Sequence, residues 1–355
     1  MNVGVVGGGV VGSVVALEAI RLGWSVTLFD APDASLRCSN TAAGMLSPCA
    51  ELETADSDLF NLGVRSLEQW PSLLRTLPEP VFFRREGSLL TAHAGDGTSL
   101  RRLLDLMDRK TGQRFAPVAP EALQVLEPQW SMRGEVYYLP NEGQIDSQGF
   151  LAAATRLFAH SGVLHRAVAS RVGPHAVDLQ DGTHHPFDWV FDCRGLGAKT
   201  DLADLRGVRG EMIWVHAPGV GLRRPLRLMH PRYRMYLVPR PDDVYLVGAT
   251  EIESEDRSPL SVRSALELLS ALFSIHSAFA EARIIRSDVN LRPAFPDNRP
   301  RVEQVDGLTR INGMFRHGFL IAPALVMDAL AFVAEGRSIS PEAIMENVEN
   351  AYAAD

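Results

Sequence analysis

The sequence predicts an α/β protein that combines a Rossmann-like βαβ unit with a second, antiparallel sheet. Two observations support the βαβ unit: an apolar, β-branched run at residues 2–6 leads into a glycine-rich turn, and helical periodicity follows. A third supports the antiparallel sheet, because MYLVP at 235–239 and VYLVGAT at 244–250 have the pattern of strands.

The glycine-rich turn has the spacing of a dinucleotide fingerprint. Gly7, Gly9 and Gly12 stand in G-x-G-x-x-G order after the first strand, and helical periodicity then runs from Val11 to about Leu22. The first glycine makes a tight turn, the second lets the backbone approach a pyrophosphate, and the third lets helix and strand pack closely. The motif alone is weak, but its place between strand and helix makes it specific.

A second strand at residues 24–30 completes the unit. It ends in Asp30, which lies 18 positions after Gly12, close to the ~20 expected for an acid that accepts hydrogen bonds from ribose hydroxyls. The sequence therefore predicts dinucleotide binding, with an unrelated glycine-rich turn as the plain alternative. The motif does not distinguish NAD from FAD.

The segment CSNTAAGMLSPCAE at residues 38–51 is rich in small side chains, which would allow a flat ring to lie against the backbone. An ordinary small-residue helix start remains the alternative. The residues expected to contact the cofactor here are Thr41, Ala42, Ala43, Gly44 and Met45, the last chiefly as a core side chain.

Composition excludes several classes of protein. The chain has 355 residues, 46% of them hydrophobic, and a net charge of −8, which argues against a general nucleic-acid or anionic-membrane partner. The uncharged run at residues 3–17 lacks a basic start and a cleavage site, so we expect no signal peptide. Three cysteines without metal spacing predict no metal site and reduced thiols in a cytoplasmic protein.

Several motifs together resemble the FAD-dependent D-amino-acid oxidase family, and within it the glycine oxidase branch associated with thiamine biosynthesis. After GGGVVG and TAAGML come YLVPRPDDVYLVGATE at 236–251, LRPAFPDNRP at 291–300 and FRHGFLIAP at 315–323, in the family's order. The resemblance covers residues 3 to about 333. It implies noncovalent FAD, since no motif supports a covalent link to Cys193.

The resemblance also implies that the FAD-binding Rossmann-like domain is interleaved with an antiparallel-sheet substrate domain. The expected FAD-binding domain comprises residues 1–80, 141–206 and 293–355. The expected substrate-binding domain comprises residues 81–140 and 207–292. The helix from about Leu320 should point its start at the flavin edge that becomes negative on reduction.

Residue roles follow from the same resemblance. Arg292 and Tyr236 match the residues that grip the substrate carboxylate, for which a bidentate guanidinium is well suited, and Arg316 matches an arginine beside flavin and substrate. From sequence alone, surface or packing roles are the alternatives. His317 is interpreted as structural. The further residues expected at FAD are Val11, Val168, Gly195, Arg316, His317, Gly318, Phe319 and Leu320.

The resemblance implies oxidative deamination of glycine, sarcosine or a small D-amino acid, by hydride transfer to flavin N5, with molecular oxygen as acceptor and hydrogen peroxide as product. A homo-oligomer is expected. Alternatives are a dehydrogenase that passes electrons to a quinone or partner protein, and a flavoprotein subunit with little turnover; an NAD dehydrogenase is the weakest. Arg234 stands two residues before Tyr236, on the same strand face, and would suit a second anionic group on the substrate, with an exposed role for Arg234 as the alternative.

Overall fold

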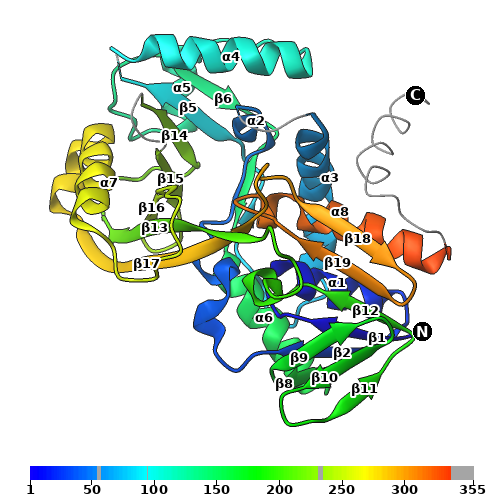
Figure 1. Ribbon diagram of the computed structural model, residues 1–355. Coiled ribbons are helices and arrows are strands. Elements are labelled where there is room, and N and C mark those ends of the chain that lie inside the picture. The colour runs from blue at the N-terminus through cyan, green and yellow to red at the C-terminus, as the bar shows by residue number, and fades with distance from the viewer. Residues whose placement is uncertain (54–56, 94, 231–234, 337–355) are drawn as a thin grey trace.

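The computed structural model describes residues 1–53, 57–93, 95–230 and 235–336, and two large sheets dominate this part of the chain (Figure 1). Arg234 lies outside the described residues, as do residues 337–355 of the expected FAD-binding domain. The two sheets confirm the predicted α/β class. The assignment of residues to two domains stays a prediction.

Within the described residues, the first sheet has six strands and is mostly parallel. Its spatial order is β18 (Arg301–Val305), β19 (Leu308–Asn312), β12 (Trp189–Asp192), β1 (Asn2–Val6), β2 (Ser25–Asp30) and β8 (Leu164–Arg166). β1 pairs in parallel with β2 and β12, and only β18 runs antiparallel to its neighbour. β1 is therefore a central strand, as its continuous apolar run predicts.

Both faces of this sheet are covered. One core joins the sheet to the helices α1 (Val10–Arg21), α3 (Ser57–Leu74), α6 (Ser147–His160) and α8 (Gly318–Ala334). A second core joins the opposite face to a small antiparallel sheet of β9 (Ala169–Gly173), β10 (Ala176–Leu179) and β11 (His184–Pro186) (Figure 1). No helix in the described ranges combines the length and apolar character that a membrane crossing requires.

The second large sheet has seven strands in the described ranges and is antiparallel except for its β14–β5 pair. Its order is β17 (Arg283–Ala294), β13 (Arg206–His216), β16 (Val244–Gly248), β15 (Met235–Pro239), β14 (Leu226–Met229), β5 (Ser88–Ala92) and β6 (Val136–Leu139). Helix α7 (Val262–Ile275) packs against one face through Leu268 and Leu272. Helix α7 therefore leaves the other face of this sheet uncovered.

Smaller elements connect the two sheets. They are β3 (Met45–Leu46), α2 (Pro48–Glu51), β4 (Phe83–Arg84), α4 (Gly97–Thr111), α5 (Pro120–Leu126) and β7 (Gly143–Ile145), with 3₁₀ turns at Ala34–Leu36, Cys38–Thr41, Gly195–Ala198 and Ser277–Glu281. β7 pairs with both β3 and β4. Ala43 packs with Met212 and Val238, so the small-residue segment touches the antiparallel sheet directly.

Element boundaries differ from the predicted ones by a few residues. Helix α1 begins at Val10, and helix α8 begins at Gly318 rather than near Leu320. The start of α8 is set by the chain before it, because Phe315 has a φ of +47° and His317 occupies the N-cap.

Candidate active site

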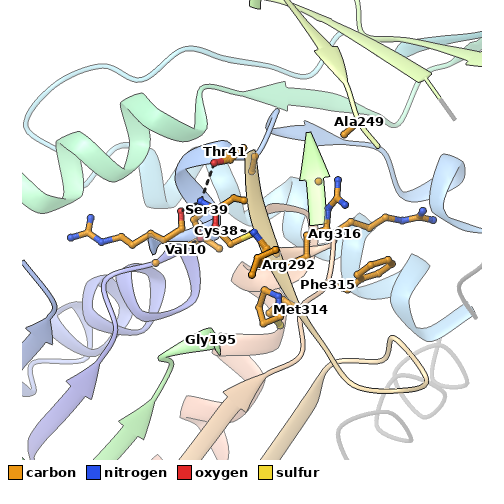
Figure 2. Close-up of a pocket in the computed structure, with 18 of the residues that line it drawn as sticks. Val10, Cys38, Ser39, Thr41, Gly195, Ala249, Arg292, Met314, Phe315 and Arg316 are labelled. Atoms are coloured by element: carbon orange, nitrogen blue, oxygen red, sulfur yellow. Dashed lines mark hydrogen bonds between the residues drawn. The ribbon is translucent and has the colours of Figure 1, made fainter. Parts of the chain in front are cut away.

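A cavity of about 940 Å³ lies between the two large sheets, near the upper end of the roughly 300–1,000 Å³ typical of small-molecule sites. We call the parts of its wall that come from the parallel sheet, α1 and residues 38–45 the floor. The cavity-facing strands of the antiparallel sheet, with the loop 249–252, are the roof. Figure 2 shows residues from both, with Val10, Ser39 and Thr41 on the floor and Arg292 on the roof.

The glycine turn behaves as its spacing predicts. Gly7 has a φ of +105°, and a Cβ built there would lie 2.5 Å from the carbonyl oxygen of Cys193. A Cβ on Gly12 would lie 1.9 Å from the carbonyl oxygen of Gly7, so this glycine allows α1 to pack against the turn. Gly9 is the N-cap of α1 and has no side chain to cap the helix. Gly9 therefore caps none of the first N–H groups of α1, and the Ser39 hydroxyl accepts the one from Val10.

Asp30 lines the cavity at the end of β2, and its carboxylate already has protein partners. Oδ1 accepts the amide of Gly8 at 2.8 Å, and Oδ2 accepts Arg166 at 2.6 Å and also Arg37. A carboxylate has about four acceptor positions, so Asp30 retains capacity for a ribose hydroxyl. Sequence reasoning missed both arginines, because nothing in their spacing marks them.

The small-residue segment forms part of the floor. Gly44 has a φ of +67°, and a Cβ there would lie 1.9 Å from the carbonyl oxygen of Ile145. The hydroxyl of Thr41 accepts Asn290 Nδ2 from β17 at 3.1 Å, which ties floor to roof. Ser39 was not predicted; its hydroxyl accepts the amide of Val10 at 3.0 Å.

The structure brings most of the predicted residues together around this cavity. The wall includes Gly7, Gly9, Val11, Asp30, Thr41, Ala42, Ala43, Gly44, Met45, Val168, Gly195, Tyr236, Arg292, Arg316, Gly318 and Phe319. Three predicted cofactor contacts are not part of the wall: Gly12, His317 and Leu320. Gly12 acts on helix packing, while His317 and Leu320 are buried beside the start of α8. Val168 lies in the connection between β8 and β9.

Arg292 extends from β17 over Gly210 of the neighbouring strand. The two residues are diagonal neighbours on one face of the sheet, and a Cβ on Gly210 would lie 2.5 Å from the guanidinium carbon. Arg292 Nη1 donates to the carbonyl oxygens of Thr250 at 2.9 Å and Arg209 at 3.4 Å. Among the ion pairs between described residues, none involves Arg292, so its charge has no carboxylate partner there.

Tyr236 stands on β15 beside Arg292. Its ring lies against Gly248, where a Cβ would be 3.1 Å from the phenol oxygen. Burial raises the pKa of the Tyr236 hydroxyl above its ordinary value, and the neighbouring guanidinium of Arg292 opposes that rise. The phenol is therefore neutral at pH 7 and able to donate a hydrogen bond into the cavity.

Arg316 also reaches the cavity, but two carboxylates hold it. Its Nε donates to Glu51 at 2.7 Å and its Nη1 donates to Glu251 at 3.1 Å. Burial raises the pKa of Glu51, but the charges of Arg316, His317 and Arg227 outweigh that effect and lower it to about 2. Glu51 is therefore ionised at pH 7, and Arg316 forms a bridge between α2 and the roof. Sequence reasoning missed Glu51.

His317 lies behind this bridge and is 4% exposed. Its Nδ1 is 3.4 Å from Glu51 Oε2. Burial lowers the pKa of His317 to about 4, although the charge of Glu51 favours protonation. The imidazole is therefore neutral at pH 7, and its structural role stays a prediction.

The wall fits the cofactor that the sequence resemblance implies. On the floor, a glycine-rich turn with no room for side chains leads into the start of α1, and a helix start is a favourable place for a pyrophosphate. The start of α8 lies beside Val10 and contributes Gly318 and Phe319 to the wall, and its N-cap residue His317 makes no side-chain cap. A helix start of this kind stabilises negative charge on a neighbouring ring.

Known proteins resemble the chain over most of its length. It matches the DAO family, described as FAD dependent oxidoreductase, over residues 2–327. A Rhizobium etli protein assigned to thiamine biosynthesis as the oxidoreductase ThiO is 37% identical, and the alignment covers 92% of this chain and 94% of that one. Glycine oxidase of Geobacillus kaustophilus is 26% identical, with 91% and 90% covered.

Solved structures show the same fold. Iminodiacetate oxidase from Chelativorans sp. superimposes with a TM-score of 0.81 at 24% identity, covering 96% of this chain and 97% of that one. Glycine oxidase from Geobacillus kaustophilus gives a TM-score of 0.79 at 24% identity, with 95% of each chain covered. Since the family match spans residues 2–327 and a relative at 37% identity covers most of both sequences, the chain belongs to the FAD dependent oxidoreductase family.

Proposed function

We propose that the protein oxidises glycine or another small amino acid, such as sarcosine or a D-amino acid, with noncovalent FAD and molecular oxygen. The products would be an imine or 2-oxo acid, ammonia and hydrogen peroxide. One observation carries the proposal: Arg292 and Tyr236 adjoin each other on the roof of the cavity whose floor has the dinucleotide fingerprint. The resemblance to glycine oxidases and to a thiamine biosynthesis protein supports it, and suggests a supply of glycine imine for the thiazole of thiamine.

In this proposal, Arg292 and Tyr236 grip the substrate carboxylate. Two backbone carbonyls hold Nη1 of Arg292, and the guanidinium has further N–H donors for a carboxylate. The neutral phenol of Tyr236 adds a donor. Together they fix the amino acid's orientation, which is the main requirement when the bound FAD supplies the hydride acceptor.

The charges around the cavity favour a substrate with a single carboxylate. Glu51 and Glu251 balance Arg316, and Glu53 pairs with Arg227. Among the described arginines on the roof strands, Arg292 is the one without a carboxylate partner; Arg257 and Arg263 line the cavity outside the roof. Arg316 then serves as a bridge that closes the wall instead of a second grip.

Noncovalent attachment agrees with the state of the thiols near the floor. Burial raises the pKa of Cys38 and raises that of Cys193 well above the ordinary value. Both are therefore protonated at pH 7, and a thiol is a far weaker nucleophile than a thiolate. FAD released intact by acid or heat would support this part of the proposal.

The visible spectrum of the purified protein tests the function. Under nitrogen, glycine should bleach the flavin band, and air should restore it with release of peroxide. Bleaching that air does not reverse would favour the dehydrogenase alternative. An unchanged band with glycine, sarcosine and D-amino acids would contradict the proposal.

A further inference from the structure

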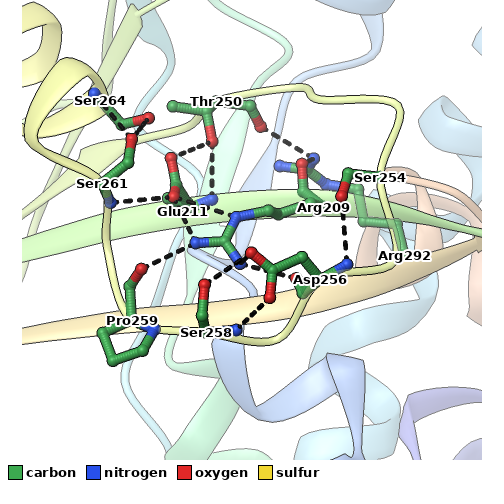
Figure 3. Close-up of polar contacts among 10 residues, drawn as sticks. All are labelled: Arg209, Glu211, Thr250, Ser254, Asp256, Ser258, Pro259, Ser261, Ser264 and Arg292. Atoms are coloured by element: carbon green, nitrogen blue, oxygen red, sulfur yellow. Dashed lines mark hydrogen bonds and ion pairs between the residues drawn. The ribbon is translucent and has the colours of Figure 1, made fainter.

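The two carbonyl groups that hold Arg292 belong to one buried polar network, drawn in Figure 3. Arg209 Nε and Nη2 donate to Glu211 Oε1 at 3.1 and 2.6 Å. Thr250 joins this pair through its hydroxyl, which accepts the amide of Glu211 at 2.9 Å and donates to its Oε2 at 3.1 Å. Because Arg209 and Thr250 also provide the carbonyls, the network sets the positions of both acceptors.

The side chains of Arg209 and Glu211 point to the face of the sheet opposite Arg292. Gly210, under the Arg292 guanidinium, and Glu211 are consecutive on β13, so their side-chain directions point to opposite faces of the sheet. The Glu211 side chain is 0% exposed and that of Arg209 is 5% exposed. Glu211 therefore acts on the site through Arg209 and Thr250.

The same pair also fixes the loop that follows Thr250. Arg209 Nη1 donates to the carbonyl of Asp256 at 2.6 Å, and Nη2 donates to that of Pro259 at 2.9 Å. Glu211 Oε1 accepts the amide of Ser261 at 3.2 Å. Burial raises the pKa of Glu211, but hydrogen bonds from Ser264, Arg209 and Ser261 outweigh it and keep the carboxylate ionised.

Protein stability alone does not explain a buried ion pair of this kind, because apolar side chains of similar volume in its place often stabilise a fold as well or better. We infer that Arg209, Glu211 and Thr250 are positioning residues that aim the Arg292 guanidinium at the substrate carboxylate. This inference rests on the proposed function, in which Arg292 is the carboxylate grip. A misplacement of about 1 Å at such a grip can cost up to about 10²-fold.

The test measures acetate binding to the holoenzyme, because acetate carries the carboxylate without the oxidisable amine. Difference spectra of the bound flavin report its Kd. Glu211→Gln removes one charge and keeps the shape of the side chain. Arg209 retains a carboxylate partner in Asp256, which lies 3.6 Å from its Nη1. We expect the acetate Kd to rise about tenfold. The KM for the amino-acid substrate should rise in parallel.

A double-mutant cycle separates positioning from general destabilisation. In an Arg292→Ala background, Glu211→Gln should leave the acetate Kd unchanged, because the grip that it aims is absent. Glu255→Gln is the matched control: Glu255 lies on the same loop and accepts Lys199 and the amide of Gly207, away from Arg292. It should leave Kd within about twofold, as surface substitutions usually do.

Thr250→Val provides an independent variant if Glu211→Gln fails to accumulate as folded holoenzyme. It removes the hydroxyl and keeps the backbone carbonyl. Thr250→Ser, which retains the hydroxyl, should bind acetate as the wild-type protein does. Unchanged Kd in both Glu211→Gln and Thr250→Val, with Arg292→Ala weakening acetate, would overturn the inference and leave the proposed function intact. Equal weakening by Glu211→Gln with and without Arg292 would also overturn it. If Arg292→Ala itself leaves Kd unchanged, the proposed grip is wrong as well.

Discussion

The floor and the roof of the cavity are built in different ways. On the floor, the determining features are absent side chains: Gly7, Gly12 and Gly44 let backbone segments pack closely, because a Cβ at each would meet a backbone oxygen. On the roof, the determining features are charged side chains, and Arg292 is held through carbonyls that a buried ion pair fixes. A floor of this kind is sensitive to added atoms, whereas the roof is sensitive to changes in orientation.

The largest expected effect concerns the roof. Arg292→Ala should lower kcat/KM for the amino-acid substrate about 10³-fold, because the substrate carboxylate loses its charged partner. This factor corresponds to about 4 kcal/mol of lost transition-state stabilisation. Steady-state kinetics provide the measurement. Arg292→Lys should recover part of the loss, since charge remains without the fork. Arg283→Ala, on the exposed part of the same strand, is the control and should be nearly silent. Equal kinetics for Arg292→Ala and Arg283→Ala would contradict the roof's role.

The next effect lies where floor and roof meet, at His317. Its pKa of about 4 in the folded protein is below the value of 6.5 for a free histidine, so the unfolded chain binds more protons between these pH values. The free energy of unfolding should therefore fall as pH drops from 6.5 to 4, by about 3 kcal/mol. Glu51, with a pKa near 2, adds a loss in the same direction below pH 4.5. Arg316, Glu251 and Arg292 also face His317.

Urea unfolding of the wild-type protein and of His317→Gln between pH 4 and 7 checks this effect. The substitution should flatten the dependence above pH 4.5 and leave the Glu51 contribution below it. An identical slope in both proteins would mean that His317 titrates normally.

A smaller effect is expected from adding one carbon to the floor. Gly12→Ala should lower the free energy of unfolding by about 2 kcal/mol, through overpacking, and reduce the amount of FAD that co-purifies. The new Cβ would meet a backbone oxygen that cannot rotate away. Gly173→Ala is the matched control, because a Cβ there meets open space. Calorimetry and flavin absorbance per chain give the two readings; equal FAD content in both variants would undermine the floor's sensitivity.

The smallest effect distinguishes the two regions most sharply. Gly210→Ala also adds one carbon, but its new Cβ would meet the movable end of Arg292 instead of backbone. The free energy of unfolding should change by less than about 0.5 kcal/mol. The KM for the amino-acid substrate should rise about tenfold, which corresponds to about 1.4 kcal/mol of binding free energy. Gly97→Ala, at an uncrowded position on α4, serves as the control. A loss of stability without a change in KM would show that the roof responds as the floor does.

This contrast also explains what could be predicted from the sequence. The floor depends on local motifs: G-x-G-x-x-G and the acid at the end of β2 lie within residues 2–30, and their geometry is largely set by glycine sterics and helix starts. The fold class followed from the same local patterns. Arg37 and Ser39 were missed although they lie close in sequence, because side-chain partners of a turn have no fixed spacing.

The roof was less accessible to sequence reasoning. Arg292 and Tyr236 were proposed only through family resemblance, since an arginine before proline or a tyrosine in a strand carries no signal of its own. Glu51, Glu211 and Thr250 act through contacts between distant segments. Their importance depends on strand register and burial, which residue patterns do not determine.

The strand order of the parallel sheet has a consequence for synthesis of the protein on the ribosome. β1 occupies the middle of the sheet, but its partner β12 lies about 180 residues later in the chain, and β19 follows later still. At 5–20 residues per second, one edge of the first apolar strand waits roughly 10–40 s for its neighbour. The nascent chain therefore depends on transient covers, its own helices or a chaperone, to avoid aggregation during that interval, and the wall of the site is complete only after the start of α8 has been synthesised.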